Sequence, residues 1–446
     1  MTSIDNFNRE LYEEHLDEAS FLYEVRTESV HDETIAWMDL EDYDNRFEAH
    51  LNGLIGGGAH ASEICINAAT AGDPGDLNVA VRLLCRQTNY TALFSLLAKL
   101  DLDDNQSHRA LIDALALGCP AHWLPPLITC IEEDNPQLLP VLLRVLAWRR
   151  AHEASSFLQR NGNNPILEDH IPWACSRLVP QSWVGKMRIL LHEGGETVDR
   201  TDCALALLRL GDPYLLGRLS ASEPWARIPL GLGGSQAHVR ELMTATQVST
   251  SGLLALGLLG DHASVPFLIH YLSVPDGADT AARALDLITG ANLYEEAFIP
   301  EEAEEDELLV EELAGFQKGE PLNNPNGEPA GEYVVRLSQE AAAWQEWWSE
   351  NESRFQTGTR YRNGLPYSPS TLLENLRAEQ CPNMIRELVH HEFLIRYGCD
   401  VPFELQMPVD KQQQAILVYS QWVKENGENY KPGAWYLFGK PQLVNG

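Results

Sequence analysis

The stretch LLALGLLGD at residues 253–261 decides the fold class of this chain. An apolar run ends there in Gly260 and Asp261. Glycine can take the left-handed conformation that closes a helix, and aspartate can cap the helix that follows. The phrase therefore predicts a tight turn between two helices that share a buried face.

The same phrase recurs at residues 71–73, 117–118 and 210–212. Gly72 and Gly118 are 46 residues apart, and Gly211 and Gly260 are 49 residues apart. A period of about 45 residues is typical of HEAT and armadillo repeats, in which helix pairs stack because neither helix can bury its face alone. We therefore expect an all-α, HEAT/armadillo-like α-solenoid with HEAT-like helical repeats over residues 59–294. The pattern is degenerate over residues 150–200, so the number of repeats stays open.

Residues 1–58 carry 15 acidic and 3 basic side chains. Their apolar residues recur at steps of three and four, which is the spacing of an amphipathic helix. The glycines at residues 56–58 end this pattern. The segment is therefore expected to form an acidic helical N-terminal cap.

Residues 295–331 are expected to form an acidic linker or long loop that is rich in Pro, Asn and Gly. Residues 295–312 hold ten acidic side chains and no basic one. Three interpretations remain open, namely a solvated linker, a docking strip for a basic partner, and a metal or acid/base site. The candidate protein-binding residues of this segment are Glu301, Glu302, Glu304, Glu305, Asp306 and Glu307.

Residues 332–446 are rich in aromatic side chains and contain an internal duplication, so that we expect an aromatic, mixed C-terminal module. The residues Trp347, Glu350, Asn351, Gly358, Tyr361, Gly364 and Pro366 recur 75 residues later as Trp422, Glu425, Asn426, Gly433, Tyr436, Gly439 and Pro441. Each copy predicts the end of an amphipathic helix, followed by a loop able to pair as a short ribbon. In one interpretation the aromatic residues pin the loop to the helix. In the other, two equivalent loops present a binding edge, which makes Trp347, Tyr361, Trp422 and Tyr436 candidate protein-binding residues.

The composition sets the expected partner. The chain has 446 residues, with 65 acidic and 32 basic side chains and a formal charge of −33. Such a surface repels phosphate, which argues against nucleic acid and favours a basic protein partner. The eight cysteines have no CxxC spacing, so we expect reduced thiols in a cytoplasmic protein. We expect no secretory leader and no membrane span.

The motifs predict no catalytic, cofactor or metal residue. The triplet His390-His391-Glu392 lacks the second histidine of a zinc-protease helix, and the two histidines fit a pair on a helix surface better. No GxSxG elbow and no Walker loop occurs. An enzyme stays an open alternative, since catalytic groups assemble in space rather than in sequence.

Both ends of the chain resemble a known family. The stretch LEDYDNRFEAHLNGL at residues 40–54 resembles the N-terminal signature of a family of proteobacterial HEAT-like repeat proteins. Residues 347–366, with Arg386-Glu387-Leu388 and Phe403-Glu404 further on, resemble its C-terminal signature. The resemblance implies an accessory role at type VI secretion or toxin loci and provides no catalytic residues.

The expected function is therefore that of a non-catalytic protein-binding scaffold, an accessory adaptor or chaperone for a type VI secretion effector. An immunity protein that neutralises a cognate toxin is the alternative, and a HEAT-like lyase is a more remote one. In the first two cases the partner is a basic effector, toxin or secretion component.

Overall fold

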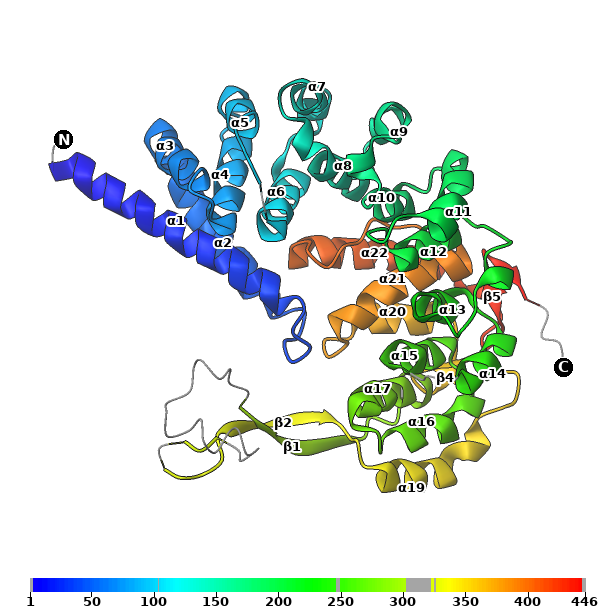
Figure 1. The fold of residues 1–446 in the computed structure, drawn as a ribbon. Helices are drawn as coiled ribbons and strands as arrows, with labels where there is room; N and C mark the ends of the chain where they lie inside the picture. Colours follow the sequence, from blue (N-terminus) through cyan, green and yellow to red (C-terminus); the bar gives the residue numbers. More distant parts are fainter. Residues whose placement is uncertain (1–2, 103, 246–248, 302–321, 325, 443–446) are drawn as a thin grey trace.

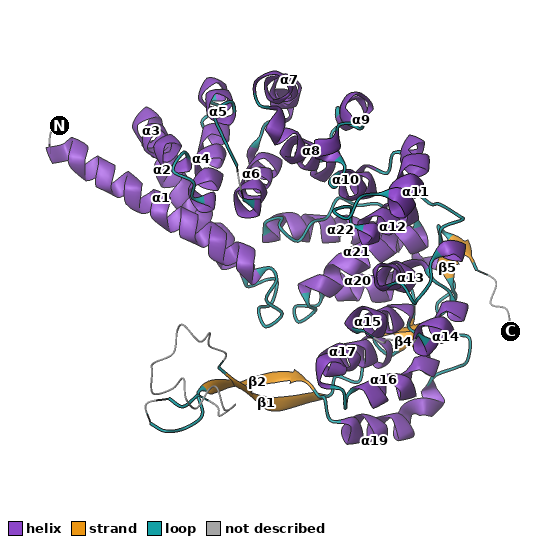
Figure 2. Ribbon diagram, viewed as in Figure 1, coloured by secondary structure: helices purple, strands orange, loops and turns teal. Residues whose placement is uncertain are grey.

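The computed structural model describes residues 3–102, 104–245, 249–301, 322–324 and 326–442. Helices make up most of these residues, and the strands among them form three two-stranded antiparallel hairpins (Figure 2). The predicted helical character is therefore confirmed. All eight cysteines lie in the described part and are unpaired.

The N-terminal segment is helical, as its spacing predicts. Helix α1 (Ser3–Ser29) packs along α2 (Leu40–Gly56) and against α4 (Pro74–Arg86). Helix α3 (Gly58–Ala69) follows α2 almost directly, so that the run of glycines is a break between two helices.

From α4 onward the helices form two rows along a curved path (Figure 1). In the inner row each helix contacts the next one. Its members are α4, α6 (Asn105–Gly118), α8 (Leu139–Trp148), α10 (Ile171–Leu178), α12 (Arg200–Arg209), α13 (Arg227–Gly233), α15 (Thr250–Leu259) and α17 (Ala278–Thr289). The outer helices are α5 (Tyr90–Leu97), α7 (Leu124–Asp134), α9 (Ala154–Asn161), α11 (Val184–Glu193), α14 (Gln236–Thr244) and α16 (Val265–Tyr271).

The repeat is shorter than the predicted period of about 45 residues. Successive inner helices begin 23 to 34 residues apart. The interval from Gly211 to Gly260 runs from the end of α12 to the end of α15, with α13 between them, and therefore covers two repeats. The turn chemistry is confirmed at these two glycines, because both have a positive φ and Asp261 accepts a hydrogen bond from the backbone N–H of Ala263. It is wrong at Gly118, which is the last helical residue of α6 and has no positive φ.

Gly257 lies at a close approach between α15 and α17. A Cβ added there would lie 2.8 Å from the Ala284 Cα and 2.9 Å from its Cβ. A side chain at this position therefore forces the two helices apart.

Gly257→Ala is expected to lower the free energy of unfolding by about 1–3 kcal/mol, the usual cost of overpacking. Gly185→Ala is the matched control, since a Cβ there meets no atom within 4 Å. Alanine also favours the helix more than glycine does, so the control should be neutral or slightly stabilising. Urea unfolding of both variants measures the difference, and equal stabilities would show that α15 and α17 do not approach this closely.

Strands form where the sequence predicts a linker. Strand β1 (Tyr294–Pro300) pairs antiparallel with β2 (Gly331–Leu337), and Tyr294 lies opposite Leu337. The prediction of a loop over 295–331 is therefore wrong at its two ends. In β1 the carboxylates of Glu295 and Glu296 are flanked by Tyr294, Phe298 and Ile299, and aromatic and β-branched residues favour a strand despite the charge. Residues 302–321 and 325 of the predicted linker lie outside the described part.

The C-terminal helices α20, α21 and α22 lie on the concave side of the inner row, whereas α19 lies beside the outer helix α16 (Figure 1). Helix α21 packs on α12 and α13, and α22 contacts α2. Their buried apolar residues belong to the same core as those of the repeats. The C-terminal elements are α19 (Ala341–Asn351), β3 (Tyr361–Arg362), β4 (Leu365–Pro366), α20 (Pro369–Arg377), α21 (Asn383–Tyr397), α22 (Val409–Asn426), β5 (Tyr436–Leu437) and β6 (Lys440–Pro441).

Candidate functional site

The two copies of the tryptophan motif have the same geometry. Asn351 donates its side-chain amide to the Trp347 carbonyl at 2.8 Å, and Asn426 donates to the Trp422 carbonyl at 3.0 Å. The hydroxyl of Tyr361 accepts a backbone N–H at 2.7 Å, and that of Tyr436 accepts one at 2.8 Å. The predicted ribbons are present as the hairpins β3–β4 and β5–β6.

Each hairpin caps the end of a helix that precedes it in the sequence. Backbone N–H groups at residues 363–364 donate to the carbonyls of residues 287 and 288, at the end of α17. Those at residues 438–439 donate to the carbonyls of residues 395 and 396, at the end of α21. The last carbonyls of a helix have no partner within it, so both hairpins stabilise a helix end.

This arrangement favours the interpretation of the four aromatic residues as structural pins. Tyr361 and Tyr436 are buried, and Trp347 and Trp422 are half-buried. The duplication also shows that the β1–β2 hairpin is an insertion. It lies between α17 and α19, where the second copy has only residues 398–408 between α21 and α22.

The acidic candidates of the predicted linker are placed only in part. Glu301 is exposed, and its backbone N–H donates to the Ala330 carbonyl at 3.0 Å. Glu302, Glu304, Glu305, Asp306 and Glu307 lie outside the described residues. A docking role for this strip therefore stays a prediction.

Helix α1 carries an exposed stripe that sequence reasoning missed. The exposed fractions of Phe7 and Phe21 are 63% and 58%. Acidic residues continue the stripe at steps of three and four, which places all of its members on one helix face. We define the α1 acidic face by the residues Phe7, Glu10, Glu14, Asp17, Phe21, Glu24 and Glu28. The apolar residues that recur at helical spacing in this segment predict only the opposite, packed side of the helix.

A second exposed apolar surface lies on the β1–β2 hairpin, which stands out from the helices in Figure 1. The exposed fractions of Tyr333 and Val335 are 72% and 74%. Their cross-strand neighbours are Phe298, whose ring centroid is 5.3 Å from that of Tyr333, and Glu296. We refer to this hairpin as the β1–β2 arm.

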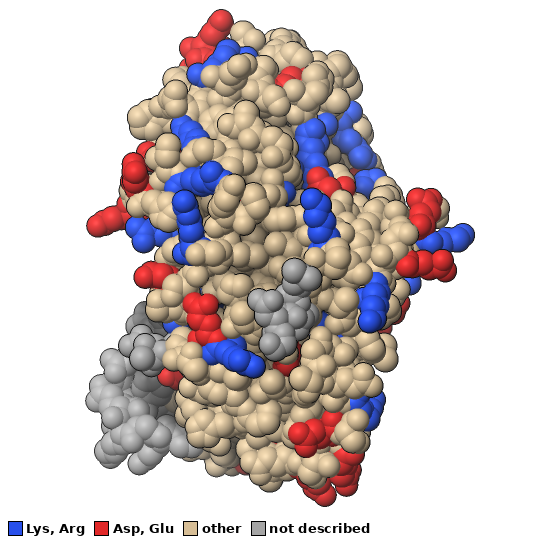
Figure 3. Space-filling model, turned by 90° about the vertical axis from the view of Figure 1, so that its right-hand side faces the viewer, with Lys and Arg blue, Asp and Glu red and all other residues tan. Residues whose placement is uncertain are grey.

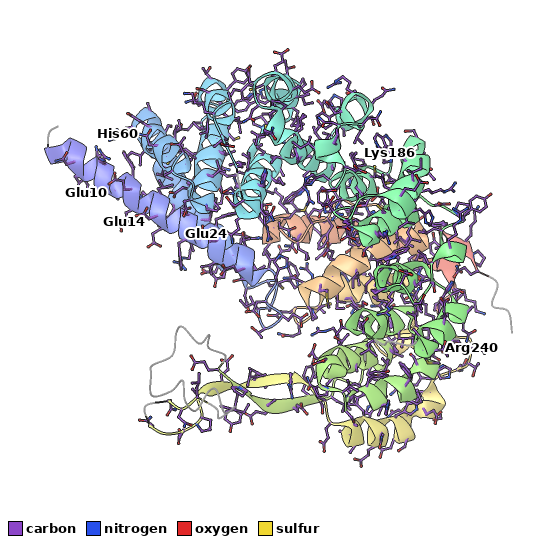
Figure 4. The ribbon with its side chains drawn as sticks, in the orientation of Figure 1. Glu10, Glu14, Glu24, His60, Lys186 and Arg240 are labelled. Atoms are coloured by element: carbon purple, nitrogen blue, oxygen red, sulfur yellow. The ribbon has the colours of Figure 1, made fainter. Side chains whose placement is uncertain are left out.

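Charge is unevenly distributed over the molecule. Figure 4 places Glu10, Glu14 and Glu24 along α1, whereas Lys186 on α11 and Arg240 on α14 lie at the opposite end. Basic side chains are as prominent as acidic ones on the face in Figure 3, which is the right-hand side of Figure 1. The protein therefore has an acidic end at α1, although its net charge alone does not show this.

A cavity of about 730 Å³ lies on the concave side of the inner row. Helices α6, α8 and α10 each line it with the side chains of one face, and the C-terminal segment contributes Glu387, Glu404 and Gln406. The basic residues that line it are Arg109 on α6, Arg144 on α8 and Arg177 on α10. The arginines lie 33 to 35 residues apart in the sequence, a spacing that has meaning only once the helices are known to stack.

Arg177 is neutralised within the protein. Its Nε and Nη2 donate to the two carboxylate oxygens of Glu404 at 3.0 and 3.1 Å. Its guanidinium carbon lies 4.1 Å from the centroid of the Trp173 ring. This pair joins the repeats to the C-terminal segment.

Arg144 and Arg109 are bonded to histidines instead. The Nε of Arg144 donates to Nδ1 of His170 at 3.2 Å, and Nη2 of Arg109 lies 3.1 Å from Nε2 of His31. Burial, and next the charge of Arg144, lower the pKa of His170 to about 4. Burial, and next the charge of Arg109, also lower the pKa of His31. Both imidazoles are therefore expected to be neutral at pH 7 and leave the charge of their arginine uncompensated.

The pair His390 and His391 is buried rather than on a helix surface, so that interpretation of the sequence is wrong. The Nη1 of Arg209 is 3.1 Å from Nε2 of His390 and 2.7 Å from Nδ1 of His391. Burial lowers the pKa of both histidines well below the usual value, and the charge of Arg209 lowers it further. Within the described ranges, no three His, Cys, Asp or Glu side chains converge as metal ligands.

Comparison of the chain with family models, curated proteins and solved structures finds no match in any of the three. In the described part of the chain, no single helix is both long and apolar enough to cross a bilayer. The bent pair Asn105–Gly118 and Ala121–Asp134, which turns by 120°, passes that test only when its helices are taken together.

Proposed function

We propose that the protein is a non-catalytic, HEAT-like α-solenoid scaffold that binds a basic protein partner through the α1 acidic face. The observation that carries the proposal is the exposure of Phe7 and Phe21 among the carboxylates of one helix stripe. Exposed aromatic side chains framed by polar groups are typical anchors of protein interfaces. The surrounding carboxylates complement basic side chains, and they raise the rate of encounter with a basic protein.

The β1–β2 arm supports the same proposal from a second element. Tyr333 and Val335 are exposed beside Glu296, so that this surface also combines apolar anchors with an acidic group. The arm and α1 both extend toward the left of Figure 1. The basic groups at the opposite end orient an approaching basic partner toward these two elements.

The acidic residues that follow β1 in the sequence extend this proposal as a docking strip. Glu301, Glu302, Glu304 and Glu305 follow directly after β1 in the sequence. Reversing all four to lysine is expected to slow association more than it speeds dissociation, as charges at the rim of an interface usually do.

The resemblance at both ends of the chain suggests which scaffold this is. It favours an adaptor that binds a type VI secretion effector together with a secretion component and then releases the effector. An immunity protein instead binds one toxin with nanomolar affinity and covers its active site. The number of partners captured together distinguishes the two roles.

Affinity capture from the source organism, followed by mass spectrometry, tests the proposal. The double variant Phe7→Ala/Phe21→Ala is compared with Ile189→Ala/Leu417→Ala, which removes two exposed apolar side chains from α11 and α22. We expect the parent and the control to capture the same basic protein and the α1 variant to lose it. Capture of the same proteins by all three would remove α1 from the interface.

A further inference from the structure

The cavity of about 730 Å³ is lined by two half-buried arginines, Arg109 and Arg144, for which no carboxylate among the described residues lies within ion-pair distance. Among the described residues, no carboxylate lies within ion-pair distance of Arg144, and Asp202 and Glu404 act on it only from further away. Arg109 has no carboxylate within that distance among the described residues either, and Asp113 acts on it only from further away. In a chain with 65 acidic residues, these two cations face the cavity with neutral imidazoles beside them.

This arrangement is costly in the empty protein. Moving a guanidinium out of water costs free energy unless an opposite charge or a set of acceptors replaces the water. For Arg144, burial lowers the pKa, and the Trp173 ring, whose centroid is 4.8 Å from the guanidinium carbon, replaces part of the lost hydration. His170 takes one of the five N–H donors of this guanidinium, so most of its hydrogen-bonding capacity is left for a group in the cavity.

The rest of the cavity wall combines polar residues with apolar ones. Its apolar residues include Ile112, Val141, Trp148 and Ile166. Cavities of roughly 300–1,000 Å³ with apolar walls and a few convergent polar groups are typical of sites for small molecules. Of the four carboxylates of the lining, Glu404 and Glu387 lie within ion-pair distance of Arg177, at 3.0 and 3.9 Å. Asp113 accepts a hydrogen bond from Tyr23 at 2.9 Å, and Asp101 is exposed before α6.

We infer that this cavity binds a small organic anion, whose carboxylate or phosphate group is held by Arg144 and Arg109 and whose apolar or aromatic body lies against the wall of α8 and α10. Guanidinium groups bind both kinds of anion in the same bidentate manner, so the two sources share one chemistry. The site is independent of the α1 acidic face, and each proposal can fail without the other.

Isothermal titration calorimetry with defined probes tests this inference. The phosphate probe is adenosine monophosphate, with adenosine as its neutral counterpart. The carboxylate probe is indole-3-acetate, with indole-3-acetamide as its neutral counterpart. We expect at least one anion to bind with a Kd below about 1 mM and its neutral counterpart to bind at least about tenfold more weakly.

The variants locate the binding. Arg144→Gln and Arg109→Gln are each expected to weaken binding of the anion at least about tenfold. Arg200→Gln is the matched control, because Arg200 is exposed on α12 and has no ion pair among the described residues. Circular dichroism melting establishes that each variant is folded, and Arg109→Gln serves as the test if Arg144→Gln is not.

Three outcomes would overturn the inference. The first is that neither anion binds, and the second is that the neutral counterparts bind as tightly as the anions. The third is that a folded Arg144→Gln or Arg109→Gln variant binds the anion as the control does. Preference for one probe identifies the acidic group as phosphate or carboxylate.

Discussion

Replacing Glu392 by alanine is expected to lower the free energy of unfolding by about 3–5 kcal/mol, as is usual when one partner of a buried ion pair is removed. The carboxylate of Glu392 is fully buried on α21. It accepts hydrogen bonds from Arg360 at 2.8 Å, from Arg362 at 2.6 Å and from the Tyr367 hydroxyl at 2.7 Å. Its removal leaves two buried guanidinium groups without their counterion.

The loss of Glu392 is also expected to weaken the contact between the C-terminal helices and the inner row. Arg360 also donates to the carbonyls of Leu258 and Leu259 at the end of α15, so Glu392 orients a side chain that joins the C-terminal helices to the inner row. Glu350→Ala on the exposed side of α19 is the control and should change stability by less than about 0.5 kcal/mol. Denaturant unfolding measures both variants, and a Glu392 variant as stable as the control would contradict the buried network.

Replacing Trp344 by alanine is expected to cost about 3–5 kcal/mol, the usual cost of truncating a large buried aromatic side chain. Its indole is fully buried, and its Nε1 donates to the Ser338 carbonyl at 2.7 Å. Trp347 is half-buried on the same helix, so Trp347→Ala should cost less than Trp344→Ala.

Thermal and denaturant unfolding of the two tryptophan variants decides their roles. The predicted order is a large loss of stability for Trp344→Ala and a smaller one for Trp347→Ala. The reverse order would mean that the motif tryptophan, rather than its neighbour, anchors α19 in the core.

The turn phrase predicted the helical character of the chain because its chemistry is local, but it did not predict the spacing of the inner helices. Thr88, Arg150 and Val179 have a positive φ just after α4, α8 and α10, where a glycine would have marked the turn. The packing of the surrounding helices holds these residues in that conformation. The missing glycines made the repeat look longer than it is, and they explain the degenerate pattern over residues 150–200.

The duplicated motif could be predicted from identities alone, because its repeated Asn and Tyr residues make local hydrogen bonds that recur in both copies. The cavity could not, because its groups come from three helices and a distant C-terminal segment. The buried triplet His390-His391-Glu392 could not be predicted for the same reason. Its charge partners Arg209, Arg360 and Arg362 are brought to it only by the folded chain.

The most direct test of the proposed scaffold function is the association rate of the captured partner as a function of salt. At about 150 mM ionic strength the field of a surface charge is screened within about 8 Å, so a rate that depends on the α1 acidic face must fall as salt is added. We predict that the rate falls steeply between low and high salt for the parent, and that Glu10→Lys/Glu14→Lys/Asp17→Lys lowers it at low salt. A rate that does not change with salt, and that is the same in the charge-reversed variant, would contradict binding of a basic partner at this face.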